Sequence, residues 1–522
     1  MTNIEFLNGT RYTDTANIEF RMPEDDFEKS NMESPEFINQ IENYIQQFRN
    51  NQLPRLQELK RYYLSDNNIK YRDTKRDKNR ADNRIASDWA KYITVFMQGY
   101  ILGNPVKYQN EDAQLVNKIE EFQNANNEDY HNGLLETDLS IYGRAYEMLY
   151  IDSDGIEKVT KLSPEQTFVV YGDTIEKNSL FGVRFYQIEF SMEKAASYVE
   201  VYTDNEMYRY ETNNNAYSGL AFKEKKETNF KGVPINEYQN NEDRLGDFES
   251  VLDSIDAYDL SQSELANFQQ DSSDAYLVIT GNPMTATDTT YEYDSSGKIV
   301  LDEYGKPVVA DNSKDGVLEA MMKARLLVLD NNNNPDGPNP NAFYLTKEYD
   351  STGVEAYKKR LVDDILRFTF TPDTNDSNFS GTQSGESMKY KLMGNDNLNK
   401  TKTRLLTKGF MRRLRLLANV WSLKNSVSTG DKITDLQDKI NDTTIKFTPN
   451  LPQNDEERIN MIKNLDGVVS DETLLTLLET FTGVDASNEL KRIDKESDKQ
   501  PINSNPRIPN NNDGVNEVDE HE

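Results

Sequence analysis

The chain has 522 residues, a formal net charge of −31 and a pI near 4.6. So acidic a composition argues against a protein that coats nucleic acid, because phosphate neutralisation requires many Lys and Arg side chains. The chain has no cysteine and only two histidines, His131 and His521, which excludes disulfides, thiolate chemistry and a histidine-based metal site. No apolar run approaches the roughly 18 residues of a membrane span, and the N-terminus lacks a signal-peptide pattern. We therefore expect a soluble protein without a membrane partner.

The N-terminal part is predicted to be an arm followed by helices. Residues 1–34 are polar and acidic with scattered aromatics, as in an arm. Apolar residues follow helical spacing over 35–59, interrupted at Pro54. Residues 60–84 interleave Lys and Arg with Asp, which is more typical of a solvated or interface face than of a DNA site. A further helix is predicted to end before Pro105.

Residues 146–239 are predicted to form a β-rich body. Short alternating runs are separated there by turn signals such as Asp154-Gly155. The clearest predicted hairpin joins 198–202 to 207–210 across Asp204-Asn205.

A helix predicted over 247–271 has the most unusual charge pattern in the chain. No Lys or Arg occurs between Arg244 and Lys298. The acidic residues of the helix are Asp247, Glu249, Asp253, Asp256, Asp259 and Glu264. A solvated face and a surface kept negative for a function both remain open. One-turn spacing could align three of the aspartates on a magnesium ion, but this stretch has no cation to clamp a phosphate, so no metal site is predicted.

Two helices joined by a polar loop occupy residues 357–424. The first is predicted to end at Thr371, because Pro372 disfavours a helical conformation for the residue before it. The loop consists mainly of Asp, Asn, Ser, Thr and Gly, so it is expected to face water or a polar partner. The second helix carries a long apolar stripe and is predicted to break near Gly394 and Gly409.

The second of these helices is also basic. Residues 398–430 contain no acidic residue. Either its cations pair with the acidic surface of a neighbouring subunit, or they contact DNA phosphates. The residues concerned are Lys400, Lys402, Arg404, Lys408, Arg412, Arg413 and Arg415.

The remaining segments are smaller. Residues 275–346 are predicted to form an α/β unit with a helix over 317–325. Ser296-Gly-Lys298 within it lacks the first Gly of a phosphate loop, so no nucleotide site is predicted. Helices are expected at 455–465 and 471–481, and the composition of the last residues predicts disorder.

Three separated stretches resemble the portal proteins of tailed double-stranded DNA bacteriophages, specifically those of long-tailed phages of Gram-positive bacteria. They are residues 83–108, residues 138–147 (Asp-Leu-Ser-Ile-Tyr-Gly-Arg-Ala-Tyr-Glu) and residues 378–392 (Asn-Phe-Ser-Gly-Thr-Gln-Ser-Gly-Glu-Ser-Met-Lys-Tyr-Lys-Leu). They occur in the order seen in that family. The likeness runs from about residue 35 to about residue 490 and is weakest over 281–342.

The resemblance implies an elongated α+β subunit, predominantly helical, that assembles into a ring with a central channel. Its implied parts are a wing that is helical and then β-rich (35–246), a stem helix (247–274), an α/β clip (275–346), a second stem helix (347–370), a tunnel loop (371–385), a long wing helix with a link (386–450) and a crown (451–493). Composition alone predicts the two ends, an N-terminal arm (1–34) and a disordered acidic tail (494–522).

The resemblance also implies a function without catalysis, metal or cofactor. Portal proteins form a ring, normally of twelve subunits, at one capsid vertex, through which DNA is packaged and ejected. The implied partners are further copies of the chain, double-stranded DNA, the terminase large subunit, the major capsid and scaffolding proteins and a head-completion adaptor or tail protein. The implied location is the portal vertex of the virion, after assembly in the host cytoplasm. The alternatives are a monomeric acidic scaffold or adaptor and a metal-dependent nuclease.

Two groups of residues would then line the channel. The acidic stem residues would repel DNA and so prevent it from being trapped. The tunnel loop would offer transient polar contacts and glycines that let the backbone move. Its predicted residues are Asp373, Asn375, Asp376, Asn378, Ser380, Gly381 and Gly385.

Overall fold

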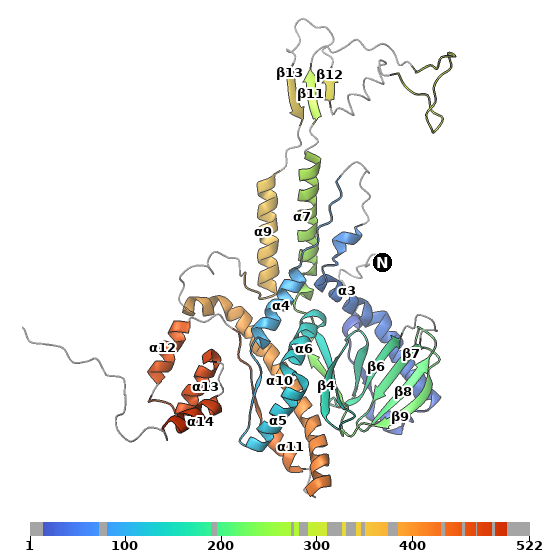
Figure 1. Ribbon diagram of the computed structural model, residues 1–522. Coiled ribbons are helices and arrows are strands. Elements are labelled where there is room, and N and C mark those ends of the chain that lie inside the picture. Colours follow the sequence, from blue (N-terminus) through green and yellow to red (C-terminus); the bar gives the residue numbers. More distant parts are fainter. Residues whose placement is uncertain are drawn as a thin grey trace, which may run out of the picture. The chain divides into compact units, whose positions relative to one another are not determined.

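The computed structural model describes residues 14–72, 81–188, 196–272, 276–280, 291–310, 326–329, 341–345, 350–373, 385–429, 434–450, 455–465, 467–482 and 486–497. The chain divides into two compact units, one of Met1–Thr382 with Met388–Asn450 and one of Gln383–Ser387 with Leu451–Glu522. Figure 1 shows the elements coloured along the sequence. Within the described ranges, no helix combines the length and the apolar character that crossing a membrane requires.

The larger unit begins with helices whose ends follow from the sequence. In α2 (Pro35–Gln47), the Phe37 amide donates a hydrogen bond to the Ser34 side chain, which caps the helix. A π-helical segment, η2 (Phe48–Gln52), joins α2 to α3 (Leu53–Tyr63). Pro54 lies in the first turn of α3, directly after this π-helical segment.

Part of the arm expected over residues 1–34 is instead packed into the larger unit. Residues of β1 (Phe20–Met22) pair in parallel with a strand of the large sheet, and α1 (Glu24–Lys29) follows directly. Phe20 and Met22 are both buried in the main core. Apolar residues two apart share one face of a strand, and one such pair is too short a signal to stand out in an acidic segment.

Two sheets form the β-rich body, and the hairpins predicted around Asp154-Gly155 and Asp204-Asn205 are confirmed. Gly155 has a φ of +77°, which a glycine adopts without strain. The first sheet has the order β1-β5-β6-β7-β8-β9 and the second the order β10-β3-β4. The strands are β3 (Arg144–Ile151), β4 (Glu157–Leu162), β5 (Thr167–Gly172), β6 (Ser179–Ile188), β7 (Ala196–Tyr202), β8 (Glu206–Thr212), β9 (Ala221–Glu227) and β10 (Ile235–Gln239).

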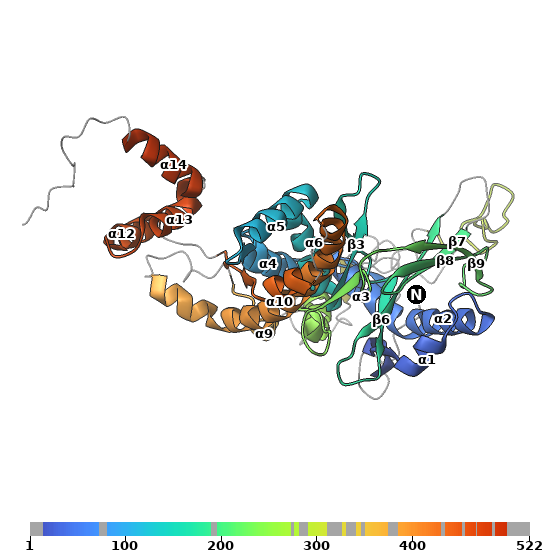
Figure 2. The ribbon, with the colours of Figure 1, turned by 90° about the horizontal axis from the view of Figure 1, so that it is seen from below.

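Both faces of the six-stranded sheet are covered. Helices α1 and α2 lie along one face, where Phe37 meets Phe181 with ring centroids 5.8 Å apart (Figure 2). Phe48 stacks on Phe168 in the same core at 5.5 Å. Part of the opposite face packs against the three-stranded sheet through a second cluster that includes Ile235. Burial of these side chains is the main force that holds the helices to the sheet.

A group of helices completes this part of the larger unit. They are α4 (Trp89–Leu102), α5 (Ala113–Asn126), α6 (Glu128–Tyr142), α10 (Gly385–Thr429) and α11 (Thr434–Asn441). A short antiparallel pair joins β2 (Lys107–Gln109) to β14 (Thr444–Lys446). It ties the segment after α4 to the segment after α11.

The expected breaks in α10 do not occur, because its 45 residues form one helix. A Cβ at Gly409 would lie 2.2 Å from a ring carbon of Tyr238, so glycine is required there for close packing. A Cβ at Gly394 would lie 3.3 Å from the ring of Phe370. Sequence alone could not distinguish a helix break from a packing site, because glycine serves both.

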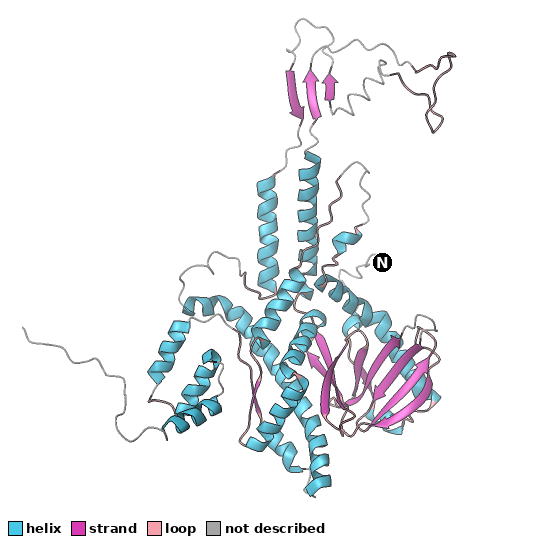
Figure 3. Ribbon diagram, in the orientation of Figure 1, coloured by secondary structure: helices cyan, strands magenta, loops and turns pink. Residues whose placement is uncertain are grey.

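Two further helices form an antiparallel hairpin, α7 (Leu252–Ser272) with α9 (Ser351–Phe368). A short turn of 3-10 helix, η4 (Glu249–Val251), leads into α7. Between the two helices in sequence lies a three-stranded sheet, visible in Figure 3, with the order β12-β11-β13. Its strands are β11 (Tyr276–Thr280), β12 (Leu326–Leu329) and β13 (Asn341–Leu345). The helix expected over 317–325 lies outside the described residues.

The described part of the smaller unit contains three helices, α12 (Asp455–Leu465), α13 (Asp471–Thr482) and α14 (Ala486–Ser497). The first two lie where the sequence predicts them, whereas α14 was not predicted. The tail expected from residue 494 therefore overlaps the end of a helix. Residues 498–522 lie outside the described residues.

Candidate functional site

The predicted tunnel loop falls mostly outside the described residues. Two of its seven predicted residues are described: Asp373, which is half-buried, and Gly385, the first residue of α10. The other five are not: Asn375, Asp376, Asn378, Ser380 and Gly381. The structure thus describes where this loop leaves α9 and where α10 begins.

The chain entering this loop is held firmly. Helix α9 ends at Phe368, and the Thr371 amide donates a hydrogen bond to the Leu366 carbonyl at 2.9 Å. The buried Thr369 hydroxyl donates to the Ile365 carbonyl at 2.8 Å. The Tyr92 hydroxyl of α4 donates to the Pro372 carbonyl at 3.2 Å. These contacts fix the start of the loop to two helices.

Two acidic residues of α7 accept hydrogen bonds from α3 and from the segment that leads from α3 to α4. Asp259 is buried and accepts hydrogen bonds from the Ser87 amide at 2.9 Å and the Asn67 amide group at 2.6 Å. Burial raises the pKa of Asp259, and the hydrogen bonds from Ser87 and Asn67 oppose that rise. Asp256 accepts from the Tyr62 hydroxyl at 2.5 Å. These carboxylates hold a neighbouring segment in place.

Three further acidic residues near α7 pair with cations from distant parts of the sequence. Asp247 lies 2.7 Å from Lys402, Glu249 lies 2.6 Å from the Arg55 Nε, and Glu264 lies 2.6 Å from Arg72. The absence of Lys and Arg from residues 245–297 therefore did not mean an absence of nearby cations. Of the six predicted acidic residues, Asp253 is the one that is exposed. The described residues contain no group of His, Asp and Glu side chains arranged to hold a metal ion.

The predicted basic set on α10 divides into buried and exposed members. Lys402 and Arg413 are buried and bind groups of their own chain, which corrects the expectation that they contact a neighbouring subunit or DNA. Arg412 is half-buried and also binds its own chain, at the Ile235 carbonyl. The buried ammonium of Lys402 lies 2.7 Å from both Glu136 and Asp247. Burial lowers the pKa of Lys402, but the two carboxylates outweigh it and raise that pKa. The exposed members are Lys400, Arg404, Lys408 and Arg415.

A buried ionic cluster that sequence reasoning missed is centred on Glu147 of β3. Arg413 approaches Glu147 at 2.6 Å, His131 approaches it at 2.9 Å, and the Tyr238 hydroxyl donates to it at 2.7 Å. Arg413 also pairs with the buried Glu128. Burial favours a raised pKa for Glu147, but Arg413 and His131 outweigh burial and hold the pKa well below its usual range. The only sequence signal was that Glu147 closes one of the portal-like stretches.

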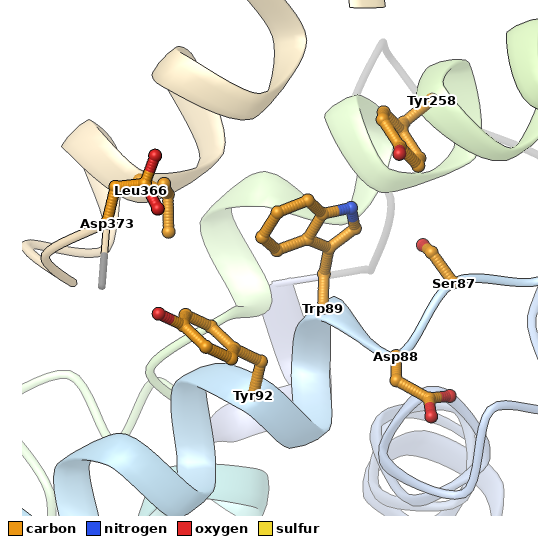
Figure 4. Close-up of a pocket in the computed structure, with 7 residues that line it drawn as sticks. All are labelled: Ser87, Asp88, Trp89, Tyr92, Tyr258, Leu366 and Asp373. Carbon is orange, nitrogen blue, oxygen red and sulfur yellow. The ribbon is translucent and has the colours of Figure 1, made fainter. Parts of the chain in front are cut away.

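A cavity of about 300 Å³ lies at the base of the α7/α9 hairpin (Figure 4). The indole of Trp89 lies between the rings of Tyr92 and Tyr258, with centroids 6.0 Å and 5.7 Å away. Ser87, Asp88, Leu366 and Asp373 complete the lining. The wall is therefore mainly aromatic, and Asp373 at the start of the loop forms one side of it. The Asp88 carboxylate points away from the rings and accepts a hydrogen bond from the Ser65 hydroxyl.

Comparisons with known proteins identify the class of this chain. Residues 42–501 match the family described as phage portal protein, SPP1 Gp6-like. That span is most of the chain, so the chain belongs to this family of structural phage proteins. The family expected from the three sequence stretches is thereby confirmed.

One relative and one solved structure give more detail. The chain is 26% identical over 234 residues to the portal protein of Bacillus phage SPP1, a match that covers 40% of this chain and 46% of that protein. The match thus spans about half the length of that relative. A chain from the neck of an empty GTA particle is 11% identical with a TM-score of 0.33, over 74% of this chain and 88% of that one.

Proposed function

We propose that the chain is the subunit of a ring-shaped portal at one capsid vertex, through which double-stranded DNA is packaged and ejected. The observation that carries this proposal is the match to the portal family over residues 42–501. The α7/α9 hairpin supports it, because two long helices that flank a small sheet suit a paired stem. At about 1.5 Å per residue, the 21 residues of α7 give a stem helix on the order of 30 Å long.

The proposed parts follow the family's plan with one change, which concerns residues 14–34. Residues 35–246 form the wing, residues 275–346 the clip and residues 451–493 the crown. Residues 14–34 belong to the wing, because β1 is a strand of its sheet. Helix α10 is the long helix of the wing, and Lys402 and Arg413 bind it to α6 and β3.

The channel is proposed to be a conduit in which like charge predominates. DNA repelled by an acidic wall is not trapped, whereas several phosphate contacts per subunit would hold it strongly. Asp253 is the exposed member of the predicted acidic set, so it is the α7 residue proposed to act on DNA. Residues 371–385 are proposed as the tunnel loop, which lines the channel and contacts DNA transiently.

The proposed partners are further copies of the chain, double-stranded DNA, the terminase large subunit, the major capsid and scaffolding proteins and a head-completion adaptor. The proposed location is the portal vertex of the virion. Energy for DNA movement would come from the separate terminase, because the family is one of structural proteins.

Negative-stain electron microscopy of the purified protein tests the proposal. We expect rings with a central hole, and mass photometry should give a mass near twelve subunits. Compact monomers at high protein concentration would contradict the portal proposal and favour a monomeric scaffold or adaptor.

A further inference from the structure

A second, much smaller cavity lies between the two sheets of the β-rich body, beside the residues that enter β1. Its volume is about 10 Å³, which leaves room for about one water molecule. The side chains around it come from residues 18–20, from β3, β5 and β10, and from Arg244. The size of the cavity limits a ligand to a single water molecule or a monatomic ion.

One lining side chain has a hydrogen-bond donor without a partner. Arg144 of β3 is 3% exposed, and its two terminal nitrogens donate to the side chains of Gln52, at 3.1 Å, and Asn17. The third nitrogen of this guanidinium, Nε, is buried and has no hydrogen-bond partner among the described residues. A buried N–H without a partner costs free energy on folding, so most such groups bind protein or ordered water. The cavity that Arg144 lines has the room for the missing acceptor.

The charges around the cavity favour a neutral ligand. Two guanidiniums line it, those of Arg144 and Arg244, together with two carboxylates, those of Glu19 and Glu237. Arg244 lies 2.9 Å from Glu237 and 2.8 Å from Glu19. An anion would be repelled by both carboxylates and a cation by both guanidiniums, so neither ion gains a clear net attraction that would offset its loss of hydration.

We infer that the cavity holds one ordered water molecule, which accepts a hydrogen bond from the Nε of Arg144. Acceptors for the hydrogens of this water also line the cavity, on the Glu237 carboxylate and the Tyr146 hydroxyl. Burial and the charge of Glu237 raise the pKa of Tyr146, whereas Arg144 lowers it, so this hydroxyl lies within electrostatic range of both charged groups.

The water completes a hydrogen-bond network that ties the residues before β1 to β3. Gln52, which accepts from Arg144, also donates to the Ile18 carbonyl at 2.9 Å. Asn17 accepts from Arg144 and belongs to the same N-terminal segment. Arg144 thus gives a physical role to a cation in one of the portal-like stretches. The site lies within a single copy of the chain, so the inference does not depend on the proposed ring.

A structure of the purified full-length chain at about 2 Å resolution tests the site, whether the chain forms rings or monomers. We expect one density peak within about 3.2 Å of the Arg144 Nε and of an oxygen of Glu237 or Tyr146. A map that resolves other buried waters but shows no peak in this cavity would overturn the inference. Crystals soaked in rubidium bromide should give no anomalous peak there, and such a peak would show that an ion takes the site.

Two neighbouring valines of β5 give a matched test in solution. Val169 lines the cavity, whereas Val170 lies on the other face of the strand, in the main apolar core. Threonine has nearly the shape of valine but adds a hydroxyl. Val170→Thr should raise the equilibrium constant for unfolding about tenfold or more, because the hydroxyl is buried among apolar side chains. Val169→Thr should raise it much less, because the water can bind the new hydroxyl. Equal increases in denaturant titrations would contradict a water molecule in the cavity.

Discussion

At the scale of single residues, buried charges in this chain bind segments that are far apart in sequence. Glu147 of β3 is fully buried and meets Arg413, which lies 266 residues further along the chain, at 2.6 Å. Lys402 likewise joins Glu136 to Asp247. A buried ion pair adds little net stability over an apolar pair, but removal of one partner leaves an uncompensated charge. These cations therefore fix the position of α10.

Arg413→Met should lower the free energy of unfolding by about 3–5 kcal/mol, because it leaves Glu147 and Glu128 buried without their cation. Arg404→Met is the matched control, since Arg404 is an exposed cation on the same helix, and it should change stability by less than about 0.5 kcal/mol. Denaturant titration followed by circular dichroism measures both. Equal effects of the two substitutions would contradict the role given to the cluster.

Asp138 should make stability depend on pH. Burial raises its pKa to about 6, although Lys161 lies 2.8 Å away and opposes the rise. The folded state therefore binds a proton at higher pH than the unfolded state, so this group's contribution to stability increases as pH falls from about 6 towards the ordinary value near 4. The wild-type chain should gain thermal stability relative to Asp138→Asn over that range.

Thermal unfolding at several pH values measures this difference. Asp154→Asn, in the exposed turn between β3 and β4, is the control for the loss of one carboxylate. A difference between wild type and Asp138→Asn that stays constant from pH 7 to about pH 4 would refute the assignment.

At the scale of elements, two glycines of α10 have opposite roles. Alanine has the higher helix propensity by about 1 kcal/mol, so either substitution would stabilise an isolated helix. Gly409 lies against the buried ring of Tyr238, whereas Gly394 lies near Phe370, which is 52% exposed and can move aside. The surroundings of each glycine therefore decide whether its replacement by alanine raises or lowers the stability of the chain.

Gly409→Ala should destabilise the chain by about 1–3 kcal/mol, because its Cβ would overlap the Tyr238 ring. Gly394→Ala should be neutral or stabilise by up to about 1 kcal/mol. The midpoints of thermal unfolding of the two variants give the comparison. Stabilisation by Gly409→Ala would show that Tyr238 can shift without cost.

At the scale of the whole molecule, the proposed conduit depends on which acidic groups remain exposed in the assembled ring. Asp259 is unsuitable as a test, because it is buried and holds Ser87 and Asn67. Asp253 is exposed on the same helix, so its replacement changes surface charge with little effect on packing. A substitution at Asp253 therefore tests the effect of surface charge on DNA passage without disturbing the packing of the fold.

Asp253→Lys should slow DNA packaging, most strongly at low salt, because each ring would then present a circle of cations to phosphate. Asp154→Lys makes the same change of charge on a turn of the β-rich body and should leave packaging unaffected. Packaging rates of particles assembled with each variant give the measurement. Equal packaging rates for Asp253→Lys and wild type would contradict the proposal that an acidic channel wall keeps DNA from being trapped.

The sequence by itself determined the local elements and the family. Periodic apolar residues located the helices α2, α7 and α9, and turn residues located the hairpins β3–β4 and β7–β8, because these signals depend on near neighbours in the chain. The helix end predicted from Pro372 also lies close to its observed position at Phe368. Three short stretches were enough to indicate the portal family.

Only the tertiary structure decided which charged side chains form ion pairs within the chain. Residues 245–297 contain no cation, yet Arg55, Arg72 and Lys402 lie beside the acidic residues of this region. Likewise, α10 looks basic along the sequence, while Arg413 and Lys402 are buried against carboxylates of α6 and β3. Charge pairing depends on distance in space, and a one-dimensional pattern cannot show which distant segments the packing of the core brings together.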